Sequence, residues 1–134
     1  MTVNIYTYTN SAPNKHKTGF CFVLEANGHT LDKKGTYIDA SKNMAEVYTT
    51  LNALHLVKKP CTINLYTSDF VKSAIESWIP KWREQGWKNS KGTPMQMEFI
   101  TLESLLKPHK YSIKSGVNEY TEWMKRQAAE MEKK

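Results

Sequence analysis

The chain has 134 residues, of which 40% are hydrophobic and 24% are charged. This length suffices for one hydrophobic core and is short for two ordinary domains, so we expect a single domain over residues 1–134. No stretch approaches the roughly 18 consecutive apolar residues of a membrane span, and the first residues lack the order of a signal peptide. We therefore expect no membrane partner. Cys21 and Cys61 have no metal-ligand spacing, which predicts buried thiols in a reducing compartment, the cytoplasm.

The formal net charge is +6. A basic balance favours a polyanionic partner, because neutralising phosphates releases their counterions. Four of the positive charges, however, lie at Lys125, Arg126, Lys133 and Lys134, where a solvated helix face explains them. The charge alone is therefore weak evidence for nucleic-acid binding.

Three strands are expected in the first third of the chain. β-Branched and aromatic residues predominate or alternate with polar ones over Val3–Tyr8, Thr18–Ala26 and Thr30–Ile38. The Asn27-Gly28 pair between the second and third strands is a strong signal for a tight hairpin. These three strands are predicted to form an antiparallel meander.

The hydrophobic period then becomes helical. Apolar residues recur at helical spacing from Met44 to Leu56, after possible N-cap residues that include Ser41. Thr62–Thr67 is predicted to be a fourth strand. Ser68 or Asp69 is expected to cap a second helix, which Pro80 breaks or redirects.

The last third of the chain predicts two more helices and one strand. A polar, basic and glycine-containing segment over Trp82–Pro94 precedes a helix over Met95–Leu106, and Lys110–Ser115 is expected to form a fifth strand. A terminal helix over Val117–Lys134 is expected to begin at an Asn118 cap. Strands four and five each follow a helix, so they should run parallel to one another. The fold class is therefore α/β: a mixed five-stranded sheet, three antiparallel strands followed by two parallel ones, flanked by about four helices.

This element order, at this length, resembles the type 1 ribonuclease H fold. Val3–Thr7 resembles the first strand of that family, which normally ends in Thr-Asp-Gly-Ser. Met44-Ala45-Glu46 is similar to the Met-Glu sequence that opens its first helix, and Leu65-Tyr66-Thr67 resembles its fourth strand, normally followed by Asp-Ser. The segment 78–88, with three tryptophans, resembles the basic handle that holds an RNA–DNA hybrid. Together these segments span nearly the whole chain.

The resemblance implies a site for two divalent ions, held by four acidic positions and assisted by a mobile histidine. Glu46 matches the glutamate of the first helix and is the expected metal ligand. The aspartate of the first strand falls on Tyr8, whose neutral phenol cannot replace a carboxylate toward a hard cation. The aspartate of the fourth strand falls on Thr67 or Ser68. Asp69 is a possible substitute, although helix capping explains it better.

The last acidic position of the family falls on Glu122, three residues after Glu119. The two carboxylates are expected on one face of the terminal helix, where an ordinary helix surface explains them equally well. The histidine loop is missing, because Ser115-Gly116 joins strand and helix directly and His109 does not correspond. We expect such a degenerate site to bind Mg²⁺ poorly. A cofactor is therefore not expected, and Mg or Mn would be required only if the residual site were active.

A nucleic-acid partner is predicted from basic and aromatic residues in the handle, and from polar residues that match the neighbourhood of the bound strands. For Trp78 core packing is favoured over ligand contact, whereas for Trp82 and Trp87 the two alternatives are equal. The candidate binding residues are Asn14, Ser41, Asn43, Lys81, Trp82, Arg83, Trp87, Lys88 and Lys91.

Three functions follow as hypotheses. The first is a ribonuclease H-like domain that binds an RNA–DNA hybrid or double-stranded RNA and has lost most or all nuclease activity. The second is an active, divergent metal-dependent ribonuclease H that uses Glu46, Glu122 and either Asp69 or Glu119. The third is a protein-interaction module on the same fold.

Overall fold

A computed structural model describes residues 1–10, 16–87 and 96–134. The strands are β1 (Thr2–Thr9), β2 (Lys17–Ala26), β3 (His29–Ile38), β4 (Thr62–Tyr66) and β5 (Lys110–Lys114). The helices are α1 (Lys42–Leu54), α2 (Asp69–Ser73), the π-helical turn η1 (Ala74–Trp78), α3 (Ile79–Glu84), α4 (Gln96–Leu106) and α5 (Thr121–Glu132). Within these ranges no helix is long and apolar enough to cross a bilayer.

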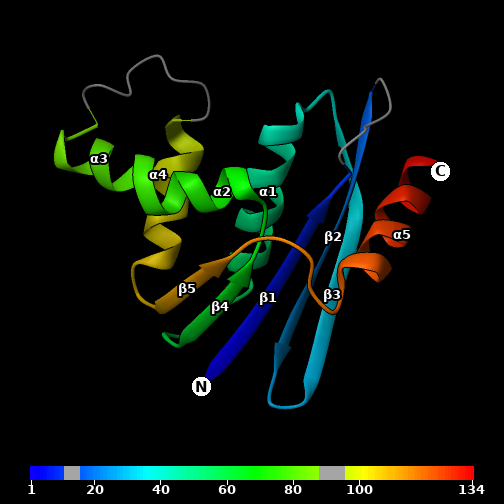
Figure 1. Cartoon of the computed structure of the whole chain (residues 1–134), viewed down its shortest axis with the longest axis horizontal. Coiled ribbons are helices and arrows are strands. Elements are labelled where there is room, and N and C mark those ends of the chain that lie inside the picture. Colours follow the sequence, from blue (N-terminus) through cyan, green and yellow to red (C-terminus); the bar gives the residue numbers. More distant parts are fainter. Residues whose placement is uncertain (11–15, 88–95) are drawn as a thin grey trace.

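The five strands form one mixed sheet in the order β3-β2-β1-β4-β5 (Figure 1). β1 pairs antiparallel with β2, and β2 with β3. β4 is parallel both to β1 and to β5. Asn27 and Gly28, both with positive φ (53° and 77°), form the tight turn between β2 and β3, as the sequence predicts. The predicted fold class and topology are confirmed.

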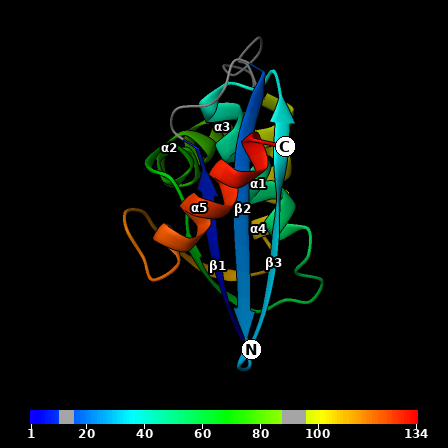
Figure 2. The same cartoon turned by 90° about the vertical axis from the view of Figure 1, so that its right-hand side faces the viewer.

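Alternation along the strands divides the buried residues between the two faces of the sheet. One face forms the main core with α1, α2 and α4, and includes Ile5 of β1 and Leu65 of β4. The other face packs against α5 through a smaller cluster of Tyr6, Cys21, Val23 and Met124. In Figure 2, α5 lies in front of β2. Helices therefore cover both faces, and α5 packs on the part of its face that β1, β2 and β3 provide.

The backbones of α5 and β2 approach each other closely at Gly19. A Cβ atom at this position would lie 2.0 Å from the carbonyl oxygen of Ala128, which is itself fully buried. The amide of Gly19 also donates a hydrogen bond to Glu132 Oε2 at 3.0 Å. Glycine is therefore required here for helix packing.

The sequence predicts that Pro80 breaks or redirects the second helix; the helical segment from Asp69 to Glu84 passes through it, so a break is wrong. The turn before the proline is a π-turn, in which the amide of Ile79 donates to the carbonyl of Ala74, five residues earlier. Proline has no amide hydrogen and its ring crowds the preceding turn. The wider turn makes room for it, so Pro80 can lie at the start of α3.

α3 ends in a Schellman motif. The amide of Trp87 donates to the carbonyl of Trp82 at 2.7 Å, and the amide of Gly86 donates to Arg83 at 3.0 Å. Gly86 has the positive φ (63°) that this motif requires. The rings of Trp82 and Trp87 pack together with their centroids 6.2 Å apart. The motif thereby fixes the position of Trp87 at the end of the described part of the handle.

Two predicted helix boundaries differ from the structure. α1 begins after an N-cap at Ser41, as predicted, but ends at Leu54, so Leu56 lies in the following turn. α5 begins at Thr121, three residues after the predicted Asn118 cap. The side-chain oxygen of Asn118 instead accepts a hydrogen bond from the backbone amide of Tyr120 at 2.8 Å. The backbone amide of Asn118 donates to the hydroxyl of Thr121. These local bonds close a separate turn before the helix.

Candidate functional site

A pocket lies where the parallel strands β1 and β4 end, on the side from which α1 and α2 begin. Adjacent parallel strands place their carboxyl ends at the same sheet edge, where ligand sites of α/β folds commonly form. The pocket has a volume of about 340 Å³. Its lining is Thr7, Tyr8, Thr9, Lys42, Glu46, Thr67, Ser68, Asp69, Phe70, Gly116, Asn118 and Thr121.

Glu46 is the most buried charged residue of the pocket lining. Its side chain is only 7% exposed, and its Oε2 accepts a hydrogen bond from Lys42 Nζ at 2.8 Å. Lys42 precedes it by one helical turn of α1 and is 47% exposed. The other carboxylate oxygen, Oε1, is buried and has no hydrogen-bond partner among the described residues. Glu46, the expected metal ligand, thus lines this pocket with an ammonium group already beside it.

Three threonine hydroxyls form a directed chain that joins the lining residues Thr7 and Thr67 to Thr50. Thr50 donates to the carbonyl of Glu46 at 3.0 Å, and Thr67 Oγ1 lies 3.1 Å from Thr50 Oγ1. Thr7 donates to Thr67 at 2.9 Å. Each hydroxyl has one hydrogen to donate, so the chain runs from Thr7 through Thr67 and Thr50 to the backbone of α1. Thr67, at a position where the ribonuclease H pattern has a carboxylate, is therefore engaged within the protein.

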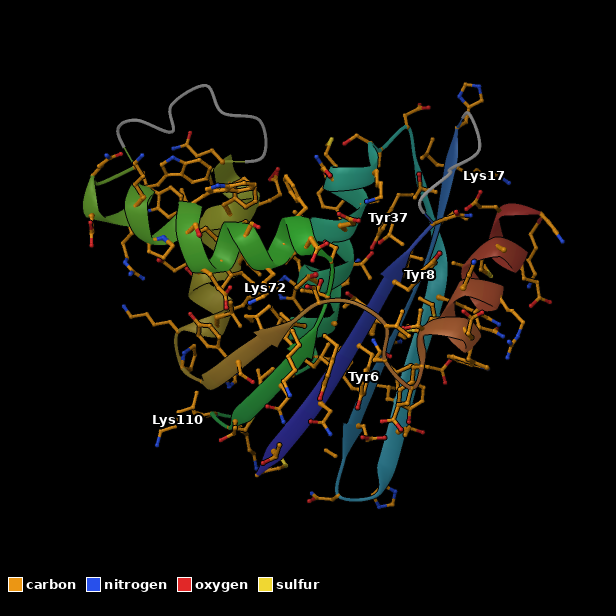
Figure 3. All side chains as sticks on the ribbon, viewed as in Figure 1. Tyr6, Tyr8, Lys17, Tyr37, Lys72 and Lys110 are labelled. Carbon is orange, nitrogen blue, oxygen red and sulfur yellow. The ribbon has the colours of Figure 1, made fainter. Side chains whose placement is uncertain are left out.

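Tyr8, on which the resemblance places the aspartate of the first strand, lies near the carboxyl end of β1 (Figure 3). Burial raises the pKa of its phenol, and the negative charges of Glu122 and Glu132 raise it further, against an opposing effect of Lys42. The phenol therefore stays neutral at physiological pH. Tyr8 can offer the pocket a hydroxyl but no charge, as the sequence predicts.

Ser68 and Asp69 follow β4 and have different roles: Ser68 caps α2, and Asp69 adds a carboxylate to the pocket lining. Ser68 is the N-cap of α2, because its hydroxyl accepts a hydrogen bond from the amide of Val71 at 3.2 Å. The favoured interpretation of Asp69 as the helix cap is therefore wrong. Asp69 is exposed, occupies the first residue of α2 and lines the pocket. It is the second carboxylate of the lining.

The two glutamates near α5 are not on one helical face, contrary to the prediction. Glu119 precedes the helix, and its carboxylate accepts a hydrogen bond from the hydroxyl of Tyr6 at 3.0 Å on the α5 face of the sheet. Glu122 is exposed in the first turn of α5 and is not part of the pocket lining. Its charge nevertheless acts on Tyr8. Glu122 thus acts on the site only through its charge, and Glu119 lies elsewhere.

The donor set does not fit a pair of divalent ions. Hard cations need several oxygen ligands and compensating negative charge. Of the lining residues only Glu46 and Asp69 are carboxylates, and Lys42 already compensates one of them. In the described part of the chain, no group of three or more His, Cys, Asp or Glu residues could hold a metal ion.

His109 and the two thiols take no part in this site. His109 lies before β5, where its Nδ1 accepts a hydrogen bond from the amide of Cys61 at 3.1 Å. Cys21 is fully buried, as predicted, whereas Cys61 is only partly buried. Burial raises the pKa of both thiols, that of Cys21 to about 12. Neither thiol is therefore an activated nucleophile.

The handle places basic residues on α3 and packs its aromatic residues. Lys81 is exposed, whereas the guanidinium of Arg83 pairs with Glu103 of α4 at 2.8 Å. Trp82 and Trp87 are partly buried against the main core. Trp78 is 37% exposed and meets Phe70 edge to face, so its predicted core position is wrong. Helix η1 directs its ring outward, toward the surface that bears Trp82.

The remaining predicted binding residues have different outcomes. Ser41 and Asn43 are both exposed at the start of α1, on either side of the pocket residue Lys42. Ser41 also caps the helix, with its hydroxyl 3.2 Å from the amide of Met44. Asn14, Lys88 and Lys91 lie outside the described residues.

Sequence reasoning missed Lys42 and the threonine chain. The Lys42–Glu46 pair could have been inferred, because a lysine four residues from a glutamate lies on the same helical face. The contact between Thr50 and Thr67 joins two elements far apart in sequence, and no local pattern predicts it.

The sheet order and the pocket at the ends of β1 and β4 define an α/β domain of the ribonuclease H-like class. The RNase H family model matches residues 1–125, and the chain belongs to this family. It is 31% identical over 111 residues to the ribonuclease H of Actinobacillus pleuropneumoniae, covering 81% of this chain and 72% of the relative. It is 32% identical over 110 residues to the ribonuclease H of Cupriavidus metallidurans, covering 80% and 76%.

Solved structures show the same fold. RNase H1 from the archaeon Halobacterium salinarum NRC-1 superposes with a TM-score of 0.65 at 19% identity, covering 98% of this chain and 97% of that one. LC11-RNase H1, solved in complex with an RNA/DNA hybrid, gives a TM-score of 0.66 at 16% identity, covering 96% and 94%. The structural likeness extends over almost the whole chain.

Proposed function

We propose that this chain is a nucleic-acid-binding member of the ribonuclease H family that holds an RNA–DNA hybrid without cleaving it by a two-metal mechanism. Family membership and the hybrid bound by LC11-RNase H1 support the choice of ligand. The single observation on which the loss of cleavage rests is the composition of the pocket, where hydroxyl groups and a lysine surround one buried carboxylate. Double-stranded RNA is a related ligand that the same surface would accept by shape.

The binding surface is proposed to run from the start of α1 to the handle. Ser41 and Asn43 offer exposed polar groups at one end, and Lys81 offers an exposed ammonium group at the other. Such contacts to phosphates position a duplex without reading its sequence. Arg83 contributes less, because Glu103 already compensates its charge. Trp78 adds an exposed aromatic surface beside Trp82, on which a sugar or base can pack.

The loss of cleavage follows from charge. Two-metal hydrolysis of a phosphodiester needs carboxylates to hold both ions against mutual repulsion. Here Tyr8 and Thr67 are neutral, and Lys42 adds a positive charge beside Glu46. A site with this composition should hold Mg²⁺ or Mn²⁺ poorly. Its groups would then serve to contact the nucleic acid, not to activate water.

The test is hybrid binding followed by fluorescence anisotropy over a range of salt concentrations. The wild-type protein should bind a labelled hybrid in EDTA, with an affinity that falls as salt rises. Lys81→Ala should weaken binding several-fold and reduce the salt slope by about one. Lys58→Ala is the matched control: Lys58 is exposed at the opposite end of β4, so its loss should change little.

Negligible affinity for hybrid and duplex RNA at low salt would reject this proposal and favour a protein-interaction module. Metal-dependent cleavage would instead support the active-enzyme hypothesis, for which Glu46 and Asp69 are the carboxylates available in the pocket. Glu119 is not available, because it is bound by Tyr6. We also propose a cytoplasmic location, which the two free thiols support.

A further inference from the structure

We infer that Lys42 is a tethered counter-ion, which takes beside Glu46 the place of a metal cation and keeps divalent ions out of the pocket. This inference rests on the metal-free pocket of the proposed function. It attributes the exclusion of divalent ions to a single side chain, that of Lys42. It follows that removal of this side chain opens a site for one divalent cation.

The first support is the environment of Glu46. A carboxylate that is only 7% exposed needs compensation by charge or hydrogen bonds, because burial strongly disfavours an isolated anion. Lys42 provides this at one oxygen, Oε2, at a distance of 2.8 Å. The other oxygen, Oε1, lies buried with no partner among the described residues. Among the described residues, the carboxylate is therefore paired at only one of its two oxygens.

The second support is a contrast within the same molecule. Lys72 and Glu76 have the same four-residue spacing as Lys42 and Glu46 and a short contact of 2.5 Å. Their side chains are 33% and 47% exposed, however, so that pair is an ordinary helix-surface pair screened by water. Of these two pairs, that of Lys42 with Glu46 is the one that combines an accessible ammonium with a buried carboxylate lining a pocket.

The third support is the oxygen-rich lining that would remain without Lys42. Glu46 and Asp69 would supply two carboxylates, and Ser68 lies between β4 and Asp69 with a further hydroxyl. Oxygen donors of this kind suit a single hard cation that keeps several of its waters. With Lys42 in place, a divalent ion at Glu46 would lie close to a fixed positive charge, and the repulsion opposes its binding. The ammonium and the metal therefore compete for the same carboxylate.

The experiment titrates Mn²⁺ into the free protein and measures unbound Mn²⁺ by electron paramagnetic resonance. Lys42→Met keeps the apolar stem of the side chain and removes its charge. This variant should bind one Mn²⁺ at least about tenfold more tightly than the wild type. Lys42→Met combined with Glu46→Gln should lose the gain. Lys72→Met, the matched control, should behave like the wild type.

A second measurement guards against misfolding of the variant. Thermal unfolding of Lys42→Met, and of Lys42→Gln as an independent substitution, should shift upward with Mn²⁺, whereas the wild type should not respond. Equal Mn²⁺ affinity of wild type and Lys42→Met, or a gain that persists without Glu46, would overturn the role of Lys42. Tight binding of Mn²⁺ by the wild type would reject the metal-free pocket as well. Nucleic acid is absent throughout, so failure of hybrid binding cannot be confused with either result.

Discussion

The hydroxyl oxygens of Thr50 in α1 and Thr67 after β4 lie 3.1 Å apart, and this contact links helix and sheet directly beneath the pocket. Both residues are buried, Thr50 completely. Two like-charged carboxylates in these surroundings would repel one another unless cations lay between them. The neutral hydroxyl pair needs no cation. This part of the pocket is therefore stabilised by hydrogen bonds within the chain.

Replacing Thr67 by Val should destabilise the fold, because the shape is kept while Thr7 and Thr50 both lose their shared partner. Removing one member of a buried hydrogen-bonded group costs about 1–3 kcal/mol. Urea denaturation monitored by tryptophan fluorescence measures the change. Thr62→Val, at the exposed start of β4, is the control and should have little effect. Unchanged stability of Thr67→Val would show that the hydroxyl chain contributes nothing to the fold.

A methyl group at Gly19 should disturb the packing of α5 on β2. The added Cβ would lie 2.0 Å from the carbonyl oxygen of Ala128, so the helix must move. Gly19→Ala is expected to lower the free energy of unfolding by about 1–3 kcal/mol. In Gly35→Ala the new atom meets only the ring of Phe20, at 3.0 Å, and a smaller loss is expected. Equal losses in the two variants would contradict the close approach of helix and sheet.

Substitution of Gly86 should loosen the end of the handle. Its φ of 63° closes the Schellman motif that brings Trp87 onto Trp82. An alanine in this conformation costs about 1 kcal/mol relative to glycine. The melting temperature of Gly86→Ala should therefore be lower than that of the wild type. Glu84→Ala, an exposed change in the same helix, should leave the melting temperature almost unaltered.

The stability of the protein should fall as the pH rises above 10, in part through Tyr120. A hydrogen bond to Glu25 favours the neutral phenol and raises the pKa of Tyr120 from 10.0 to about 12. Between these two values the unfolded chain binds fewer protons than the folded one, so the free energy of unfolding decreases with pH. This contribution is fully present below pH 10 and is lost as the pH passes about 12.

Urea denaturation at pH 9, 10 and 11 measures this slope. Tyr120→Phe should show a shallower loss than the wild type over the same interval. Part of the decrease in unfolding free energy with pH should remain in this variant, because burial also raises the pKa values of Tyr6 and Cys21. An identical slope in the variant would mean that the bond between Tyr120 and Glu25 has no effect on the titration of the phenol.

The sequence was informative wherever the physical signal is local. Alternation and the Asn27-Gly28 turn predicted the antiparallel meander, and the helical period after Ser41 placed Glu46 correctly at the start of α1. No break occurs at Pro80, because the neighbouring π-turn makes room for the proline ring. The terminal helix does not begin after Asn118, because the side chain of Asn118 closes a separate turn before the helix. Local propensity cannot distinguish these outcomes.

The composition of the site was predictable only in part. That neutral residues stand at Tyr8 and at Thr67 or Ser68, where the resemblance implies carboxylates, can be read from the residue types. Which groups stand in place of these carboxylates cannot be read from the residue types. It depends on which side chains meet between helix and sheet, as Thr50 and Thr67 do. Lys42 lies between these cases: its spacing from Glu46 was visible, but the burial that gives the pair its importance was not.

The proposed loss of cleavage is tested most directly by an assay on a labelled RNA–DNA hybrid, with protein in excess so that the hybrid is fully bound, in the presence of Mn²⁺ or Mg²⁺. The hybrid should stay bound and intact with either metal. Metal-dependent cleavage that disappears in a folded Glu46→Gln variant would contradict the proposed loss of cleavage and would establish an active ribonuclease H.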